Sequence, residues 1–122
     1  MKIMCMEKYF TVCGIGNGGG IIVDSIYQQY AINGKELWKD SSVDLMAIGN
    51  AWDLKELSVI NKVKGKVAQI SFARITVFIA CLGGDTMPVL LPYYIEMAKQ
   101  QNSHVLVCFT LPFAIEGKES VD

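Results

Sequence analysis

A length of 122 residues is that of one domain, and a composition with 52% hydrophobic and 19% charged residues is that of a globular chain. The formal net charge of −1, with no cluster of Lys or Arg, argues against an electrostatic nucleic-acid binder. No apolar run reaches the length of a membrane span, and the N-terminus lacks the apolar segment of a signal peptide. The four cysteines lie far apart without CxxC spacing, which indicates buried thiols in a reducing compartment, most simply the cytoplasm.

Early in the chain, a glycine-rich turn joins two apolar runs. Residues 8–13 are apolar and β-branched and predict a strand, whereas residues 20–30 carry apolar side chains at helical spacing. In such a unit the N–H groups of the turn point to one place beside the positive end of the helix dipole, where phosphate or another anion binds. Gly14, Gly16 and Gly19 satisfy the pattern GxGxxG, but a packed turn without a ligand satisfies it too.

Apolar strand-like segments alternate with helical segments along the rest of the chain. Residues 31–44 contain Asn33-Gly34 and predict a connection with at most one helical turn. Asp53 is a candidate cap for a short helix, and residues 64–66 predict a turn. The remaining predicted elements are strands at 44–49, 67–72, 75–82 and 105–110 and helices within 50–57 and 88–101.

This alternation predicts an α/β fold, a three-layer sandwich around a mostly parallel, Rossmann-like sheet. The continuous apolar run at residues 75–82 is typical of a strand that is covered on both faces. The glycine loops follow strands and are therefore expected together at one edge of the sheet. The residues expected on central strands are Val12, Ala47, Phe78 and Val107.

The segments that end these strands read VCGIGNGGGIIVDSI, DLMAIGNAWDLKEL, and TVFIACLGGDTMPVLLPYYIEMAK with HVLVCFTLPFAIEGKE downstream. In order and internal spacing they resemble the N-terminal nucleotide-binding domain of the FtsZ/tubulin family, and TLPFAIEG is the most specific part. The resemblance covers residues 10–118 and implies a parallel sheet whose loops hold a guanine nucleotide, GTP or GDP. It makes residues 1–122 a single domain of this type, lacking the family's central helix and C-terminal domain.

The second glycine loop departs from the family pattern. Where the family has GGGTGTG, residues 83–89 bring in Asp85 and Pro88. A proline removes one N–H donor, and a carboxylate places negative charge near phosphate oxygens. Both changes oppose the binding of a triphosphate.

Other positions match the family in part. Ile21 stands where the family has Asn, and Ser120 stands where it has Arg, whereas Glu116 matches the family's ribose-contacting Glu. Asn50 and Asp53 match the NTD segment only with one extra residue. The candidate nucleotide-binding residues, if that function is kept, are Gly14, Gly16, Asn17, Gly18, Gly19, Gly20, Asn50, Gly83, Gly84, Asp85, Thr86 and Glu116.

Two elements that hydrolysis needs in the family have no counterpart. Only two residues separate VAQISF from ITVFIA, where the family has a γ-phosphate-sensing loop and a helix. The acidic residues that complete GTP hydrolysis belong to the family's C-terminal domain. No Ser or Cys has a base at motif spacing, and His104 reads as a surface residue, so we expect neither catalytic residues nor a metal site.

Three functional classes remain open. The favoured one is a divergent, non-hydrolysing FtsZ/tubulin-like protein that acts by protein association in a structural or regulatory role. The alternative is a small nucleotide-binding protein that keeps a phosphate ligand at the first glycine loop. An unrelated dinucleotide-binding domain is the third, although Gly49-Asn50 after the second strand is a poor substitute for the expected acid.

Association is expected at the last strand. Without a central helix over VLVCFT, this strand and Leu111, Phe113 and Ile115 beyond it would leave apolar surface open to water. We therefore expect a homo-oligomer, most simply a two-fold homodimer, with a related FtsZ/tubulin-like protein as the competing partner.

Overall fold

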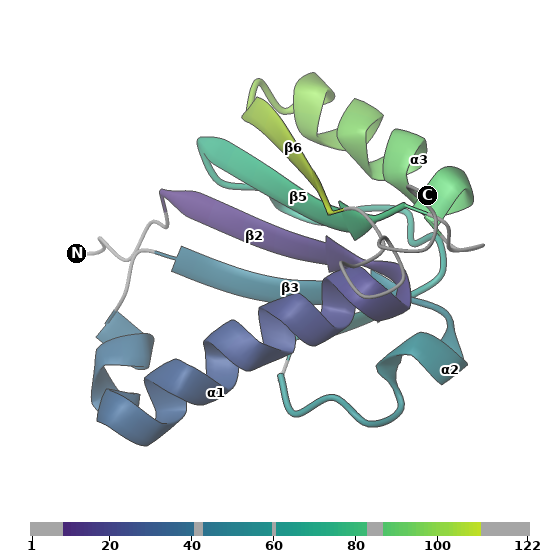
Figure 1. Cartoon of the computed structure of the whole chain (residues 1–122). Coiled ribbons are helices and arrows are strands. Elements are labelled where there is room, and N and C mark those ends of the chain that lie inside the picture. Colours follow the sequence, from purple (N-terminus) through teal and green to yellow (C-terminus); the bar gives the residue numbers. More distant parts are fainter. Residues whose placement is uncertain (1–8, 41–42, 60, 83–86, 111–122) are drawn as a thin grey trace, which may run out of the picture.

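The structure, a computed structural model, describes residues 9–40, 43–59, 61–82 and 87–110 (Figure 1). Strands and helices alternate along most of this part of the chain, as the sequence predicts. The elements are β2 (Phe10–Ile15), α1 (Gly16–Asp40), β3 (Val43–Gly49), α2 (Ala51–Leu54), β4 (Lys62–Lys64), β5 (Ile75–Cys81), α3 (Met87–Gln100) and β6 (His104–Thr110).

One sheet of five strands forms the middle layer, in the order β4-β3-β2-β5-β6, and every neighbouring pair is parallel. On β2, Val12 lies opposite Leu45 on one side and Val77 on the other. The predicted parallel α/β sandwich is therefore confirmed. The prediction that Val107 lies on a central strand is wrong, because β6 is the last strand of the described sheet and pairs with β5 alone.

Helices cover both faces of the sheet (Figure 1). Toward α3, the buried core consists of Cys13, Ile15, Met46, Ile48, Phe78, Ala80, Leu90, Leu91, Tyr94 and Ala98. Toward α1 and α2, it consists of Val23, Leu45, Ala47, Leu54 and Val59. Alternate side chains of each strand enter opposite cores because successive residues of a strand point to opposite faces.

Helix α1 is longer than predicted at both ends. It begins at Gly16 inside the glycine run and continues to Asp40, through the stretch predicted as a connection. Residues 35–37 are Lys, Glu and Leu, which are good helix formers, and one Gly in a helix costs only about 1 kcal/mol. The turn signal at Asn33-Gly34 is therefore outweighed.

The strand predicted at residues 67–72 is absent, and the short strand β4 lies just before it, where it pairs with β3. After β4, Gly65 has φ 65°, a left-handed conformation that favours glycine, and the chain turns away from β3. Residues 65–73, here named the strap, then run along α3. Side chains take over the hydrogen bonds that a strand partner would have made.

Three side chains, those of Tyr93, Tyr94 and Gln101, bind the backbone of the strap between Gly65 and Phe72. Tyr94 donates from Oη to the Gly65 carbonyl at 2.5 Å and accepts from the Val67 N–H at 2.9 Å. Tyr93 Oη donates to the Val67 carbonyl at 2.7 Å. The Gln101 amide donates to the Ile70 carbonyl at 2.6 Å and accepts from the backbone N–H of Phe72 at 2.8 Å. These side-chain contacts, made across 26 to 31 positions of sequence, replace a β ladder.

Candidate functional site

The turn between β2 and α1 has the tight geometry that its glycines predict. Gly16 has φ 78°, so a residue with a side chain would be strained there. Gly14 and Gly19 bring strand and helix together: a Cβ on Gly14 would lie 2.1 Å from the Gly19 carbonyl oxygen. A Cβ on Gly19 would lie 2.3 Å from the carbonyl oxygen of Ile79 on β5. The three glycines of the GxGxxG pattern thus have distinct steric roles.

The turn is open and carries no negative charge. Asn17 is exposed and Gly18 is half-buried, whereas Gly16, Gly19 and Gly20 are buried. The first turn of α1 contains no acidic residue. The first N–H groups of any helix lack partners within the helix, and they carry the positive end of its dipole. This end of α1 is therefore suited to an anion.

The position of the turn relative to the sheet also favours ligand binding there. From β2, the chain moves through α1 to β3 on one side, and the later unit β5–α3–β6 lies on the other side of β2. Helices α1 and α3 cover opposite faces (Figure 1). The carboxyl ends of β2 and β5 are therefore a topological switch point, where ligands of open α/β sheets bind. Gly16 follows β2 at this point.

Cys81, the last residue of β5, lies beside the turn. A Cβ on Gly18 would come 2.3 Å from the Cys81 Sγ, and this sulfur accepts a hydrogen bond from Thr110 Oγ1 at 2.8 Å. The end of β5 therefore meets the first turn of α1. Sequence reasoning did not place Cys81 here, because strand order is not visible in the local pattern.

Asn50 has a structural role at the carboxyl end of the neighbouring strand β3. It is the N-cap of α2: its side-chain oxygen accepts from the Asp53 N–H at 2.8 Å, and the Asp53 carboxylate accepts from the Asn50 N–H at 3.0 Å. This capping box corrects the prediction that Asp53 itself is the cap. Asn50 is exposed, and its backbone follows β3, the strand next to β2.

The remaining candidates lie outside the described residues: Gly83, Gly84, Asp85, Thr86 and Glu116. Gly20 lies on α1 and faces Leu57, whose Cδ1 would be 3.1 Å from an added Cβ. Pro88 occupies the second position of α3, where a helix tolerates proline because that N–H has no partner within the helix. The structure thus assembles the first glycine loop and leaves the second untested.

Asp24 is a buried acid that sequence reasoning passed over. It lies on α1 with 6% of its surface exposed, and its carboxylate accepts hydrogen bonds from two backbone N–H groups after α2. A lone acid between Val23 and Ile26, within the apolar pattern of the helix, is the signal that could have indicated it. Its contacts are structural and lie within the fold.

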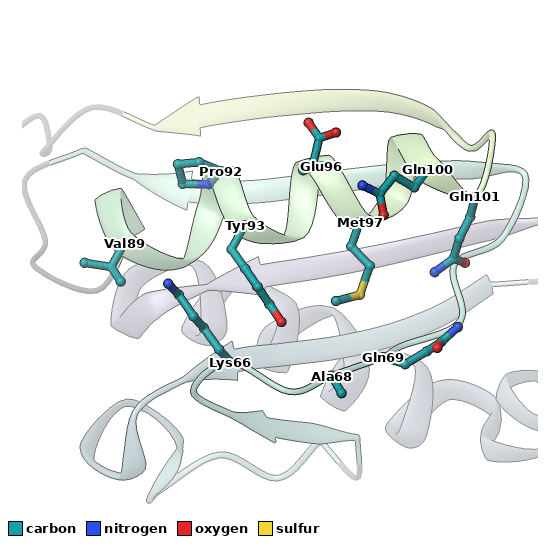
Figure 2. A pocket seen from close by; sticks show the side chains of 10 residues that line it. All are labelled: Lys66, Ala68, Gln69, Val89, Pro92, Tyr93, Glu96, Met97, Gln100 and Gln101. Carbon is teal, nitrogen blue, oxygen red and sulfur yellow. The ribbon is translucent and has the colours of Figure 1, made fainter.

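A groove lies on the other side of the sheet, between α3 and the strap (Figure 2). Its volume is about 750 Å³, and its walls mix apolar, amide and charged side chains. Lys66 Nζ lies 5.1 Å from the centre of the Tyr93 ring, and Glu96 is on the same helix as Tyr93. Figure 2 shows Lys66 and Tyr93 on facing walls. None of the predicted site residues lines this groove.

Metal ligands and membrane spans can be judged for the described part of the chain. There, no three side chains of His, Cys, Asp or Glu come together in a way that could hold a metal ion. Within the same residues, no helix joins the length and the apolar character that crossing a bilayer requires. His104 is exposed at the start of β6, as expected.

Comparison of the chain with models of protein families gave no match, and comparison with curated proteins gave none either. Membership in the FtsZ/tubulin family therefore stays a prediction that rests on the quoted segments. The cytoplasmic location also stays a prediction.

Proposed function

We propose that this chain is a divergent FtsZ/tubulin-like module that binds the phosphate of a nucleotide at the β2–α1 turn. The nucleotide is GTP or GDP in preference to others, and the chain does not hydrolyse it. One observation carries the proposal: the glycine turn, with Gly16 in a left-handed conformation, lies at the switch point of the sheet. The absence of an acid from the first turn of α1 supports it, because a carboxylate there would compete with phosphate for the helix N-terminus.

The lack of hydrolysis follows from the family resemblance. In the family, a γ-phosphate-sensing loop precedes the strand that corresponds to β5, and acidic residues of another domain complete the reaction. Here only Arg74 separates the end of the strap, Ala73, from β5. We therefore expect a bound nucleotide to act as a structural ligand rather than as a substrate.

A thermal-shift screen against GTP, GDP, ATP and NAD tests the binding. A ligand at one hundred times its dissociation constant adds about 2.7 kcal/mol to the free energy of unfolding, which raises Tm by roughly 10 °C in a domain of this size. We expect a shift with GTP or GDP and no release of phosphate above background. A shift with NAD alone would instead support the unrelated dinucleotide-binding class, and no shift with any of the four would refute the proposal.

A second candidate function is protein association in a structural or regulatory role. The observation that favours it is on β6, where Leu106 is 57% exposed and Phe109 is 51% exposed. The two side chains lie on opposite faces of this strand, and an edge strand with exposed apolar side chains readily pairs with another chain. Light scattering on the purified chain tests this directly, since a monomer at all concentrations up to 100 micromolar would refute self-association.

A further inference from the structure

The last described strand of the sheet has a free edge and a largely bare face. Within the described residues, β6 pairs with β5 on one side only. Val105 and Val107 pack toward α3, so the residues between them face the other side of the sheet. On that side Leu106 is 57% exposed, and Cys108 is exposed as well. An edge strand with exposed apolar side chains can pair with a strand of another chain.

Hydrogen bonds identify the backbone groups that point outward from this edge. The His104 N–H donates to the Arg74 carbonyl, and the Thr110 carbonyl accepts from the Leu82 N–H, so both residues point toward β5. Backbone groups alternate in direction along a strand. Val105, Val107 and Phe109 therefore aim their N–H and C=O groups away from β5, along the open edge.

The two edges of the sheet differ in how they are protected. The opposite edge is β4, which has only three residues, of which Lys62 and Lys64 are exposed. Short length and lysines are devices that keep an edge from pairing with another chain. By contrast β6 has seven residues, no charged Lys, Arg, Asp or Glu, and no proline. Among the strands that the structure describes, β6 is therefore the only edge left open to a partner.

We propose that β6 pairs with β6 of a second copy of this chain, antiparallel about a two-fold axis at Val107, and joins two five-stranded sheets into one. This inference rests on the second candidate function, protein association. Val107 is the centre of the strand His104–Thr110, so this axis overlaps the two strands over their full length. Val107 is also among the residues whose N–H and C=O groups point outward. An axis at this residue therefore gives full overlap of the two strands and also aligns their free N–H and C=O groups for hydrogen bonding.

The register of this pair is determined by the axis. Val105 lies opposite Phe109 of the second copy, and Leu106 lies opposite its Cys108. The apolar Leu106 then packs on Cys108 and loses its contact with water. No like charges meet, because β6 has no Lys, Arg, Asp or Glu, and His104 at one end lies opposite Thr110 of the second copy. Pairing of β6 with β6 is also more favourable than pairing of β6 with β4 of a second copy, because Lys62 and Lys64 of β4 would then lie against apolar side chains.

Oxidative cross-linking of the full chain tests the register. In the proposed dimer, residue 106 and residue 108 of the second copy form a pair that is not hydrogen-bonded, with Cα atoms about 4.5 Å apart, which suits a disulfide. Leu106→Cys should therefore give a covalent dimer with the native Cys108 under copper–phenanthroline and air, and it should return to monomer on reduction. Phe109→Cys is the matched control: it is similarly exposed but faces the other side of the strand, and it should cross-link no more than the unaltered chain.

Lysine substitutions test the surface by sedimentation equilibrium. Leu106→Lys with Phe109→Lys should raise the dimer dissociation constant at least ten-fold and leave the circular dichroism spectrum and unfolding midpoint of the monomer unchanged. Val89→Lys, at a site on α3 with the same 57% exposure, should leave the dimer intact.

The results of these experiments distinguish failure of the β6 pairing from failure of the association on which it rests. A dimer that survives the double lysine variant, or that Leu106→Cys does not cross-link, would overturn the β6 pairing while association itself stands. A chain that is monomeric and uncross-linked at 100 micromolar would refute both. Neither result depends on the nucleotide screen.

Discussion

Asp24 on α1 accepts a 2.6 Å hydrogen bond from the backbone N–H of Val59, which lies 35 positions later in the chain. The same carboxylate oxygen accepts from the Ser58 N–H at 2.7 Å, and the other oxygen accepts from the Gln28 amide at 2.8 Å. Val59 is buried in the core beside α1. Asp24 thus anchors the segment between α2 and β4 to the first helix.

Replacing this carboxylate should destabilise the fold. Asp24→Ala leaves two backbone N–H groups without an acceptor, and each such group costs about 1–3 kcal/mol when it is buried. We expect the free energy of unfolding to fall by about 2–5 kcal/mol in urea titration. The neighbouring Ser25→Ala, at an exposed position on α1, should change it by less than about 0.5 kcal/mol. Equal effects of the two substitutions would contradict the anchoring role.

The two adjacent glycines of α1 should respond differently to alanine. A Cβ on Gly19 would lie 2.3 Å from the Ile79 carbonyl oxygen, a backbone atom, whereas a Cβ on Gly20 would meet only the end of the Leu57 side chain at 3.1 Å. Gly19→Ala should therefore cost several kcal/mol or prevent folding, because helix and strand must separate. Gly20→Ala should be near neutral, since Leu57 can shift and alanine favours the helix by about 1 kcal/mol. Thermal unfolding of the two variants side by side decides this.

A charge placed in the turn should separate ligand binding from stability. Asn17→Asp adds a carboxylate to the first turn of α1, which favours the helix dipole by about 0.3–1 kcal/mol but repels phosphate. We expect an unchanged or slightly higher Tm without ligand and loss of the shift that GTP or GDP produces. Ser25→Asp adds the same charge about 12 Å further along the helix, by the rise per residue, and should keep the shift. If Asn17→Asp keeps it as well, the nucleotide does not bind at this turn.

Alkaline pH should destabilise the protein through Cys13. Burial, with a smaller contribution from the charge of Asp44, raises the pKa of the Cys13 thiol far above its usual value of 9.0. The unfolded chain therefore loses this proton above about pH 9 while the folded protein keeps it. Stability is complete below this pH and falls as pH rises, by up to about 1.4 kcal/mol per pH unit.

Two alanine variants isolate this effect in urea titrations between pH 7 and 11. Cys13→Ala should be less stable than the unaltered chain at pH 7, because it opens a small cavity, but its stability should fall less steeply above pH 9. Cys108→Ala, at an exposed site, should change neither the stability nor its slope. The pKa of Tyr94 is also raised, mainly by burial, and this adds a further fall in stability above pH 10. A slope unchanged by Cys13→Ala would count against the assignment.

Much of the fold could be predicted from local pattern. The strand–turn–helix around Gly16, the buried strands near Ala47 and Phe78, and the helix that contains Tyr94 all follow from apolar periodicity and glycine placement. These signals act between residues a few positions apart, so the sequence alone reveals them. The same reasoning predicted the apolar strand β6, although it placed Val107 on a central strand, and association at this strand stays a prediction.

Other features depended on contacts between residues far apart in the chain. The strap looks like a strand, yet the hydroxyls of Tyr93 and Tyr94 and the amide of Gln101 bind its backbone. The β propensity of these residues cannot predict which groups bind their backbone. An extended segment can form its backbone hydrogen bonds with side chains as well as with a neighbouring strand.

The site itself divides in the same way. The sequence by itself determined that a glycine turn would open into a helix with no acid in its first turn. Only the tertiary structure decided that the turn lies at the switch point of the sheet, beside Cys81, because strand order is settled by which faces can be covered together. It also decided that β6 ends the described sheet while lysines protect β4, since an edge exists only once all pairings are made.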